Sequence, residues 1–303
     1  MNKRRILITG GSGQVGKELL RCRWPSDIEL VAPTRQELDL SDCHNIEQYL
    51  DANDFSAVVN SGAYTAVDRA EMDVKTAWKV NALAPAIMAA ITKTRGIPIL
   101  HVSTDYVFDG SKDGPYIEND HVSPLGVYGA SKEAGEQAIR TGNPRHIILR
   151  TAWVFSEHGS NFVKTMLRLR TGNSIVRVVN DQQGSPTSAG AIAETITAMT
   201  ITLLGERSAP VGTYHFTNEG EATWFAFADE IFKQCEALGY AVPRRECITS
   251  DEFPTLARRP KNSALSLAKI GRDFGIVPKH WREPLSDVLA ALLSSEVLRK
   301  DVQ

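Results

Sequence analysis

The residues with the clearest chemical potential are Tyr128 and Lys132, which lie four positions apart in the sequence. Positions i and i+4 share one face of a helix, so a helix would place the phenol and the ammonium on the same side. A phenol has a pKa of about 10 and is a weak acid at neutral pH, but a nearby ammonium lowers that pKa. The pair therefore predicts a proton donor, Tyr128, activated by Lys132, although the same spacing also occurs in surface pairs without a function.

Polar residues that would complete such a site follow an apolar run at residues 97–103. Ser103, Thr104 and Asp105 stand at the predicted carboxyl end of this strand, where doubly wound sheets place their chemistry. A hydroxyl at this place can donate a hydrogen bond to a substrate oxygen that gains negative charge during reduction. The segment therefore strengthens the interpretation of Tyr128 and Lys132 as a catalytic pair.

A glycine-rich turn near the N-terminus predicts a dinucleotide site. Its glycines follow the apolar run Arg4–Thr9 with the spacing G-x-x-G-x-x-G and open a predicted helix at residues 13–22. Only glycine permits the tight turn and the close approach of a pyrophosphate to a helix N-terminus. The spacing also fits an ordinary strand–helix turn, but its place before a strand–helix alternation favours the dinucleotide. The predicted contacts are Gly10, Gly11, Ser12, Gly13, Gln14, Val15 and Gly16.

The second predicted strand, residues 29–32, is followed by Arg35 and has no carboxylate at its tip. An acidic residue there binds a free ribose 2′-hydroxyl, whereas a basic residue suits a 2′-phosphate. Arg35 therefore favours NADPH over NADH, although a solvated surface arginine explains it equally well. Further predicted cofactor contacts are Asp39 and Leu40 near the adenine, although Asp39 could equally cap the following turn. After the third strand they are Ala63, Tyr64 and Thr65, a segment that could also be a simple tight loop.

The scaffold that would position these residues is a parallel sheet. Alternation of apolar strands with helices is typical of an α/β fold with a doubly wound sheet covered on both faces. The predicted strands are residues 4–9, 29–32, 57–60, 97–103 and 146–150, and the predicted helices are 13–22, 43–52, 67–94 and 126–141.

The second half of the chain is less regular and predicts a smaller domain packed on the first, with a ligand cleft between them. We place the dinucleotide-binding domain at residues 1–150, with returns near 178–218, and the substrate domain at 151–177 and 219–303. The predicted helices are 161–170, 189–204, 224–238 and an amphipathic tail at 285–298, and the predicted strands are 175–179 and 213–217.

Composition narrows the class of protein and its partners. The chain has 303 residues, of which 42% are hydrophobic and 23% charged, so we expect a globular protein. A net charge of -2 offers no basic surface for nucleic acid, and no apolar run approaches a membrane span. The four cysteines are scattered, which disfavours a disulfide framework and fits a reducing compartment. We therefore expect a cytoplasmic protein without nucleic-acid or membrane partners.

Several motifs resemble those of the extended short-chain dehydrogenase/reductases and, more narrowly, of the dTDP-4-dehydrorhamnose reductases. The resemblance implies a modified Rossmann domain with a smaller C-terminal α/β domain for a dTDP-sugar. It also implies NAD(P)H-dependent reduction of the C4 ketone of dTDP-4-dehydro-6-deoxy-L-mannose to dTDP-L-rhamnose, a step toward lipopolysaccharide. The matching segments span nearly the whole chain and are residues 9–16, 63–68, 80–85, 103–110, 128–132, 150–155, 181–187 and 259–263.

The same resemblance assigns roles to individual residues. Tyr128 is the implied proton donor, Lys132 its partner and the anchor of the nicotinamide ribose, and Thr104 the hydroxyl on the substrate oxygen. Trp153 could instead be a core aromatic residue, and Arg259 could belong to a structural ion pair. The implied substrate contacts are Thr104, Asp105, Tyr128, Trp153 and Arg259.

Some members of this family form homodimers around magnesium held by glutamates, so a homodimer is one assembly open to this chain. Glu18 matches one of those glutamates, but the other two stretches read Ala189-Gly190-Ala191 and 290–292, Ala-Ala-Leu, without a carboxylate. A hard cation needs several oxygen ligands. We therefore predict no bound metal.

Other activities of the same fold are partly distinguishable. A 4,6-dehydratase needs a second carboxylate directly after Thr104-Asp105, where this chain has Tyr106, and no residue pair suits an epimerase-reductase. A 4-ketoreductase of other stereochemistry, giving a talose-type sugar, stays open because pocket shape sets the face that receives hydride. A non-catalytic nucleotide-binding regulatory subunit also stays open, although an intact Tyr128 and Lys132 argue against it.

Overall fold

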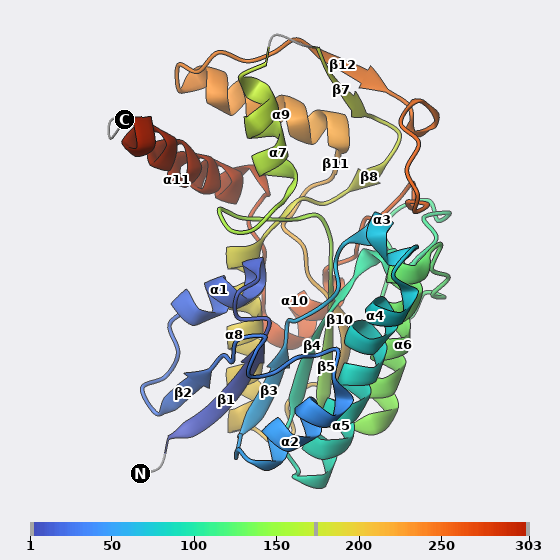
Figure 1. Ribbon diagram of the computed structural model, residues 1–303, viewed down its shortest axis with the longest axis vertical. Coiled ribbons are helices and arrows are strands. Elements are labelled where there is room, and N and C mark those ends of the chain that lie inside the picture. Colours follow the sequence, from blue (N-terminus) through green and yellow to red (C-terminus); the bar gives the residue numbers. More distant parts are fainter. Residues whose placement is uncertain (1–2, 173–174, 301–303) are drawn as a thin grey trace.

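A six-stranded parallel sheet forms the larger unit of the molecule (Figure 1). The computed structural model describes residues 3–172 and 175–300. The chain passes from β1 to β2 on one side and returns to β3 on the other side of β1. Open α/β sheets bind ligands at this kind of reversal, beyond the carboxyl ends of the strands. In spatial order the strands are β10 (Gly212–His215), β5 (His146–Thr151), β4 (Ile99–Thr104), β3 (Ala57–Asn60), β1 (Arg4–Thr9) and β2 (Ile28–Val31).

The central strands alternate between two cores because successive side chains of a strand point to opposite faces. In β1, Ile6 and Ile8 are fully buried in one core, and Leu7 is fully buried in the other. Helices cover both faces (Figure 1), which confirms the predicted doubly wound α/β fold. The first face is covered by α1 (Gln14–Arg21), α8 (Ala189–Gly205) and α10 (Ala268–Phe274), and the second by α2 (Cys43–Asp51), α5 (Ala84–Thr94) and α6 (Val127–Gly142).

A smaller unit, drawn in the upper half of Figure 1, has a separate apolar core. Phe155, Phe227 and Trp281 are fully buried in it. The helices of this unit are α7 (Phe162–Arg170), α9 (Trp224–Ala237) and α11 (Arg282–Lys300), with a 3₁₀ turn at Ser250–Glu252. Three two-stranded pairs complete it: β7 (Val176–Val179) with β12 (Arg245–Ile248), β8 (Gln183–Gly184) with β11 (Ala222–Thr223), and β6 (Val154–Phe155) with β9 (Thr187–Ser188).

The single helix predicted at residues 67–94 is wrong, because the chain forms several pieces there. A turn at residues 71–73 separates the first two helices, and a π-helical turn then leads into α5, in whose first turn Pro85 stands. Because proline has no N–H, Pro85 cannot donate to the preceding turn at this junction, where the π turn passes into α5. The pieces before α5 are α3 (Val67–Ala70), α4 (Val74–Trp78) and the π turn Lys79–Leu83.

Some segments belong to a different unit from the one predicted for them. Val178 of β7, predicted to return to the sheet, packs in the core of the smaller unit instead. Ile270 of α10, predicted in the substrate domain, packs in the core beside β10. Within 178–218, α8 and β10 do belong to the sheet unit.

None of the helices in residues 3–172 and 175–300 combines the length and apolar character that a membrane span needs.

Candidate active site

A cleft of about 1020 Å³ lies at the carboxyl ends of the strands, between the glycine turn and the smaller unit. Phe162 and Trp224 line it from the smaller unit. Two predicted site residues, Gly16 and Arg259, are not among the residues that line the cleft. The predicted residues that do line it are Gly10, Gly11, Ser12, Gly13, Gln14, Val15, Arg35, Asp39, Leu40, Ala63, Tyr64, Thr65, Thr104, Asp105, Tyr128, Lys132 and Trp153.

The glycine turn after β1 has a backbone that side chains would disrupt. Gly10 adopts φ +70°, a conformation that glycine reaches without strain, and a Cβ there would lie 2.6 Å from Gly62 Cα. A Cβ on Gly16 would lie 2.1 Å from the Gly10 carbonyl oxygen, so Gly16 shapes the turn from behind the cleft. Helix α1 then begins at Gln14 with its first N–H groups unpaired within the helix. The turn therefore fits the pyrophosphate of a dinucleotide.

Gln14 has a second role that the sequence did not indicate. Its Oε1 accepts hydrogen bonds from Ser156 Oγ and Asn161 Nδ2, both at 2.8 Å. These partners stand more than 140 positions later in the chain and belong to the segment that enters the smaller unit. The side chain of Gln14 thus ties the start of α1 to the far wall of the cleft.

The loop after β3 is held by Asn81 of the π turn. The Asn81 amide accepts from the Tyr64 N–H at 2.8 Å and donates to the Tyr64 carbonyl at 3.1 Å. It also donates to Ser131 Oγ of α6 at 3.0 Å. Single π turns inside helices occur frequently at functional sites. Here the turn connects the predicted cofactor loop to the helix that carries Tyr128 and Lys132.

Tyr128 and Lys132 stand in the first two turns of α6, as the spacing predicted, and both line the cleft. The Lys132 ammonium donates to the Val102 carbonyl oxygen at 2.7 Å and lies 3.2 Å from His101 Nε2. Burial lowers the pKa of Lys132 to about 8, and the Glu136 carboxylate opposes this effect in part. The lysine is therefore held against the end of β4.

The expected lowering of the Tyr128 pKa is not found. Burial raises the pKa of the phenol to about 12, the Thr104 hydroxyl counteracts part of the rise, and the Asp105 carboxylate adds to it. Helical spacing predicted the ammonium beside the phenol, whereas the Lys132 side chain extends to acceptors on β4. Tyr128 consequently keeps its proton at neutral pH, which is the form a proton donor needs.

Thr104 and Asp105 form a pair beside the phenol. The Thr104 hydroxyl donates to Asp105 Oδ1 at 2.9 Å and accepts from the Tyr106 N–H at 3.2 Å. Asp105 Oδ2 is buried without a hydrogen bond of normal geometry in the described part of the chain. Burial raises the pKa of Asp105 to about 6, and the hydroxyls of Ser263 and Thr104 offset part of this rise. A buried carboxyl thus faces the reaction space.

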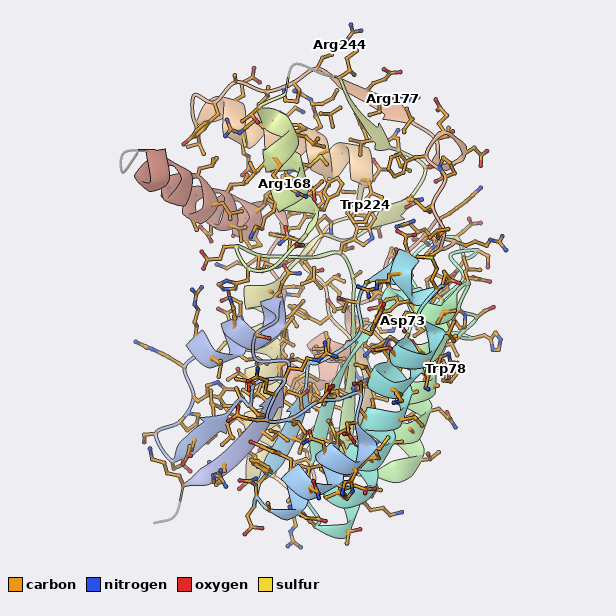
Figure 2. The ribbon with its side chains drawn as sticks, viewed as in Figure 1. Asp73, Trp78, Arg168, Arg177, Trp224 and Arg244 are labelled. Carbon is orange, nitrogen blue, oxygen red and sulfur yellow. The ribbon has the colours of Figure 1, made fainter. Side chains whose placement is uncertain are left out.

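Trp153 has a strained backbone and a stacked side chain. Its φ is +46°, the left-handed region that bulky residues rarely adopt. Its ring stacks on Trp224 with a centroid distance of 3.5 Å and an interplanar angle of 6°. Figure 2 shows Trp224 at the side of the smaller unit that faces the sheet unit. Trp153 and Trp224 both line the cleft, but only Trp153 was predicted there, because no local motif distinguishes Trp224.

Two predicted arginines have carboxylate partners. Arg259 Nη2 lies 2.7 Å from Asp68 Oδ2, so this side chain forms the ion pair that was the alternative to a substrate contact. A contact with the nucleotide remains a prediction and requires that pair to rearrange. Arg35 is 78% exposed at the cleft, with its Nε 3.6 Å from Asp39 Oδ1, and is free to meet a larger anion.

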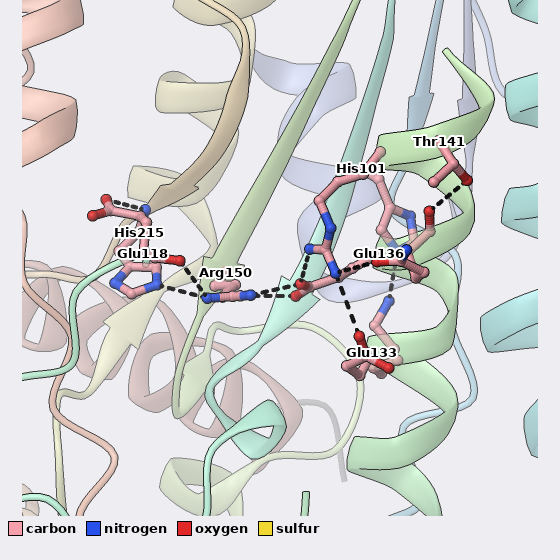
Figure 3. Close-up of polar contacts among 10 residues, drawn as sticks. His101, Glu118, Glu133, Glu136, Thr141, Arg150 and His215 are labelled. Carbon is pink, nitrogen blue, oxygen red and sulfur yellow. Dashed lines mark hydrogen bonds and ion pairs between the residues drawn. The ribbon is translucent and has the colours of Figure 1, made fainter. Parts of the chain in front are cut away.

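A buried ion pair stabilises the base of the site (Figure 3). Arg150 of β5 donates to both Glu136 carboxylate oxygens of α6, at 2.9 and 2.7 Å. Arg150 also contacts His215 Nε2 of β10 at 3.4 Å (Figure 3). Burial would raise the pKa of Glu136, but the bonds from Arg150 outweigh it and keep that pKa below its usual value. The pair thereby fixes α6 on the sheet.

A group of possible metal ligands lies outside this cleft. Glu18, Glu157 and His158 each bring one ligand atom within 4.8 Å of the others. The sequence analysis considered only Glu18. Arg21 forms an ion pair with Glu157 and lies 3.5 Å from Glu18, so a cation already faces these carboxylates. The absence of a bound metal stays a prediction.

Known proteins share this arrangement along nearly the whole chain. The family model described as RmlD substrate binding domain matches residues 4–294. A dTDP-4-dehydrorhamnose reductase of Aggregatibacter actinomycetemcomitans is 42% identical over 94% of this chain and 98% of its own. Crystal structures of a dTDP-4-dehydrorhamnose reductase from Clostridium acetobutylicum and of one from Bacillus anthracis in complex with NADP superpose with TM-scores of 0.88 and 0.87. Their identities are 35% and 32%, and each match covers 95% of this chain and 99% of the other. The chain therefore belongs to the dTDP-4-dehydrorhamnose reductase family.

Proposed function

We propose that this chain reduces the C4 ketone of dTDP-4-dehydro-6-deoxy-L-mannose to dTDP-L-rhamnose with NAD(P)H. The observation that carries the proposal is one cleft in which a dinucleotide turn, a protonated phenol and a hydroxyl at the end of β4 converge. The relatives described above are named as reductases of dTDP-4-dehydrorhamnose. A nucleotide-sensing subunit would have no use for a buried proton donor.

The residues of the chain divide the work of the reaction. The bound nicotinamide supplies a hydride to the carbonyl carbon. Tyr128 transfers its phenolic proton to the carbonyl oxygen as negative charge develops there. The Thr104 hydroxyl donates to the same oxygen once it turns away from Asp105 Oδ1, its acceptor in the structure. An alkoxide is a far stronger base than a phenolate, so the transfer is downhill even from a phenol with a pKa of about 12. Lys132 holds the ribose side of the site and keeps a positive charge close to it.

NADPH is the proposed preferred reductant, because Arg35 lines the cleft after β2 and its side chain is 78% exposed, so its guanidinium can bind a 2′-phosphate. The four cysteines are free thiols, which supports the proposal that the enzyme acts in the reducing cytoplasm. A homodimer also remains a proposal, and size-exclusion chromatography with light scattering would test it.

The function is tested first with Tyr128→Phe, which removes one hydroxyl and little volume. We expect the turnover number to fall by roughly 10²–10⁴, the usual contribution of general acid catalysis, while the dissociation constant of NADPH changes little. Tyr49→Phe is the matched control, because Tyr49 stacks on Phe55 away from the cleft. If Tyr128→Phe retains most of its turnover, Tyr128 is not the proton donor.

The substrate assignment is tested with the purified protein, dTDP-4-dehydro-6-deoxy-L-mannose and each reduced nicotinamide. Loss of nicotinamide absorbance and an NMR spectrum of a rhamno-configured product are the expected results. A talo-configured product would keep the reaction type and refute the stereochemistry. No oxidation of either coenzyme would refute the reductase itself.

A further inference from the structure

Behind Lys132 lies a row of buried polar side chains that the reaction as described does not use. His101 of β4, Asn60 of β3 and Thr9 of β1 are each at most 1% exposed. The strand register places them side by side, since Asn60 is opposite His101 and Thr9 is opposite Asn60. Three buried polar side chains in one row are costly unless they bond to one another.

These side chains form a continuous chain of contacts. His101 Nε2 lies 3.2 Å from Lys132 Nζ, and His101 Nδ1 lies 2.9 Å from the Asn60 amide nitrogen. The Asn60 amide oxygen lies 2.6 Å from Thr9 Oγ1, which also accepts from the Gly62 N–H at 3.2 Å. Thr9 directly precedes Gly10 of the glycine turn. The row therefore joins the catalytic lysine to the glycine turn at Gly10 and to the loop at Gly62.

The chemistry of the groups fixes the tautomer of the imidazole. An ammonium group has only donors, so His101 Nε2 must present its lone pair to Lys132. Burial lowers the pKa of His101 well below its usual value, so the ring is neutral and its one proton lies on Nδ1. Nδ1–H then needs an acceptor, which Asn60 offers when its amide is turned from the orientation given above, so that the oxygen faces the ring. The Asn60 NH₂ group then donates to Thr9 Oγ1 in place of the bond that Thr9 donates to the Asn60 oxygen.

We propose that His101 is a positioning residue that, held by Asn60, fixes the Lys132 ammonium and couples it to the glycine turn. His101 touches neither coenzyme nor sugar, because it does not line the cleft. Among residues 3–172 and 175–300, the acceptors that contact the Lys132 ammonium are the Val102 carbonyl and this ring. Without the ring the flexible side chain loses one of the two contacts that aim it. The proposal rests on the reductase function for its kinetic consequences, but not for its structural ones.

The test compares His101→Leu with His101→Gln. Leucine fills similar space without an acceptor, whereas the glutamine amide oxygen can reach the position of Nε2. We expect His101→Leu to lower the turnover number by about ten- to a hundredfold, the cost of a misplaced catalytic group, and to weaken NADPH binding. His101→Gln should restore most of both. Equal impairment of the two variants, or normal kinetics of His101→Leu, would overturn the proposal.

A pH profile adds a readout that a packing defect would not change. The ionisable groups around Lys132 are Tyr128 and Glu136 on its own helix, Asp105 after β4, and Arg150 of β5 beyond Glu136. All of them remain in both variants. His101→Leu should shift the alkaline limb of the turnover profile, and His101→Gln should return it toward the wild-type position. An unshifted limb in His101→Leu contradicts the coupling.

A direct measurement keeps the proposal testable if His101→Leu does not fold, or if the protein proves not to be a reductase. Nitrogen NMR of the wild-type histidine rings distinguishes the tautomers, and the signal missing from His101→Gln identifies His101 among the seven histidines. We expect a neutral ring with its proton on Nδ1. A proton on Nε2, or a ring that titrates near neutral pH, would refute the positioning role of His101 whatever the activity is.

Discussion

Replacing Asp105 with asparagine should stabilise this protein and impair it. The carboxyl has a pKa of 3.8 in an unfolded chain and of about 6 in the buried site. Each unit of pKa corresponds to roughly 1.4 kcal/mol, so the ionised carboxylate lowers the free energy of unfolding by about 3 kcal/mol. Asparagine has nearly the same shape and can still accept from Thr104, but it carries no charge. We therefore expect a gain of about 1–3 kcal/mol at neutral pH.

The sign of the pH dependence makes this prediction specific. Between about pH 3.8 and pH 6 the folded state binds more protons at Asp105 than the unfolded state does. Stability therefore falls as pH rises through this window, and the full penalty is present above it. Near pH 4 the wild type and Asp105→Asn should have similar stability, and the difference should grow until about pH 7.

Urea unfolding followed by tryptophan fluorescence at pH 4.5, 6 and 8 measures this difference. Asp113→Asn, at an exposed position, is the control and should change stability by no more than about 0.5 kcal/mol at any pH. Ketosugar turnover of Asp105→Asn should fall, because the carboxyl faces the reaction space. A difference between the variant and the wild type that is absent at pH 8, or that does not depend on pH, would refute a buried ionised Asp105.

Three further perturbations test other parts of the structure. Arg35→Ala should raise the Michaelis constant of NADPH about tenfold and leave that of NADH nearly unchanged, as expected for a lost charge-assisted hydrogen bond. Equal effects on the two coenzymes would show that Arg35 does not bind a 2′-phosphate. Trp224→Leu should raise the Michaelis constant of the dTDP-sugar several-fold by releasing Trp153, while Trp224→Phe and coenzyme titrations serve as controls, and unchanged sugar kinetics would contradict this role. Arg150→Met leaves Glu136 buried without its main partner and should lower the free energy of unfolding by about 3–5 kcal/mol. A double variant with Glu136→Gln should recover part of this loss, and full stability of Arg150→Met in urea titrations would show that the pair is not needed.

The sequence predicted those features of the fold that depend on local pattern. The strands 4–9 and 57–60 have the predicted bounds, and β4 begins two residues later than expected. Pro98 explains this delay, because it cannot donate to a neighbouring strand. Most of the predicted site residues line the cleft because parallel strands bring their carboxyl ends to one edge, so residues after different strands meet there.

The features that the sequence did not reveal depend on partners far along the chain. Nothing near Gln14 indicates that its amide bonds to Asn161, and no motif singles out Trp224 as the partner of Trp153. His101 lies inside an apolar run, so the sequence alone suggests an ordinary core residue. Its polar neighbour Asn60 is known only from the strand register. Long-range polar contacts of this kind become visible only when the strand order is known.

The misjudged acidity of Tyr128 changes how the pair is understood. A phenol with a lowered pKa would suit removal of a proton from an alcohol, the direction in which a sugar is oxidised. Burial instead keeps Tyr128 protonated, and the Lys132 charge is directed at Val102 and His101 on β4. At pH 7 Tyr128 is in the protonated form that a reduction uses, since each reduction begins with the phenol and ends with the phenolate. Burial lowers the pKa of Lys132 to about 8, so the positive charge that the lysine holds against β4 is lost as pH rises through this value.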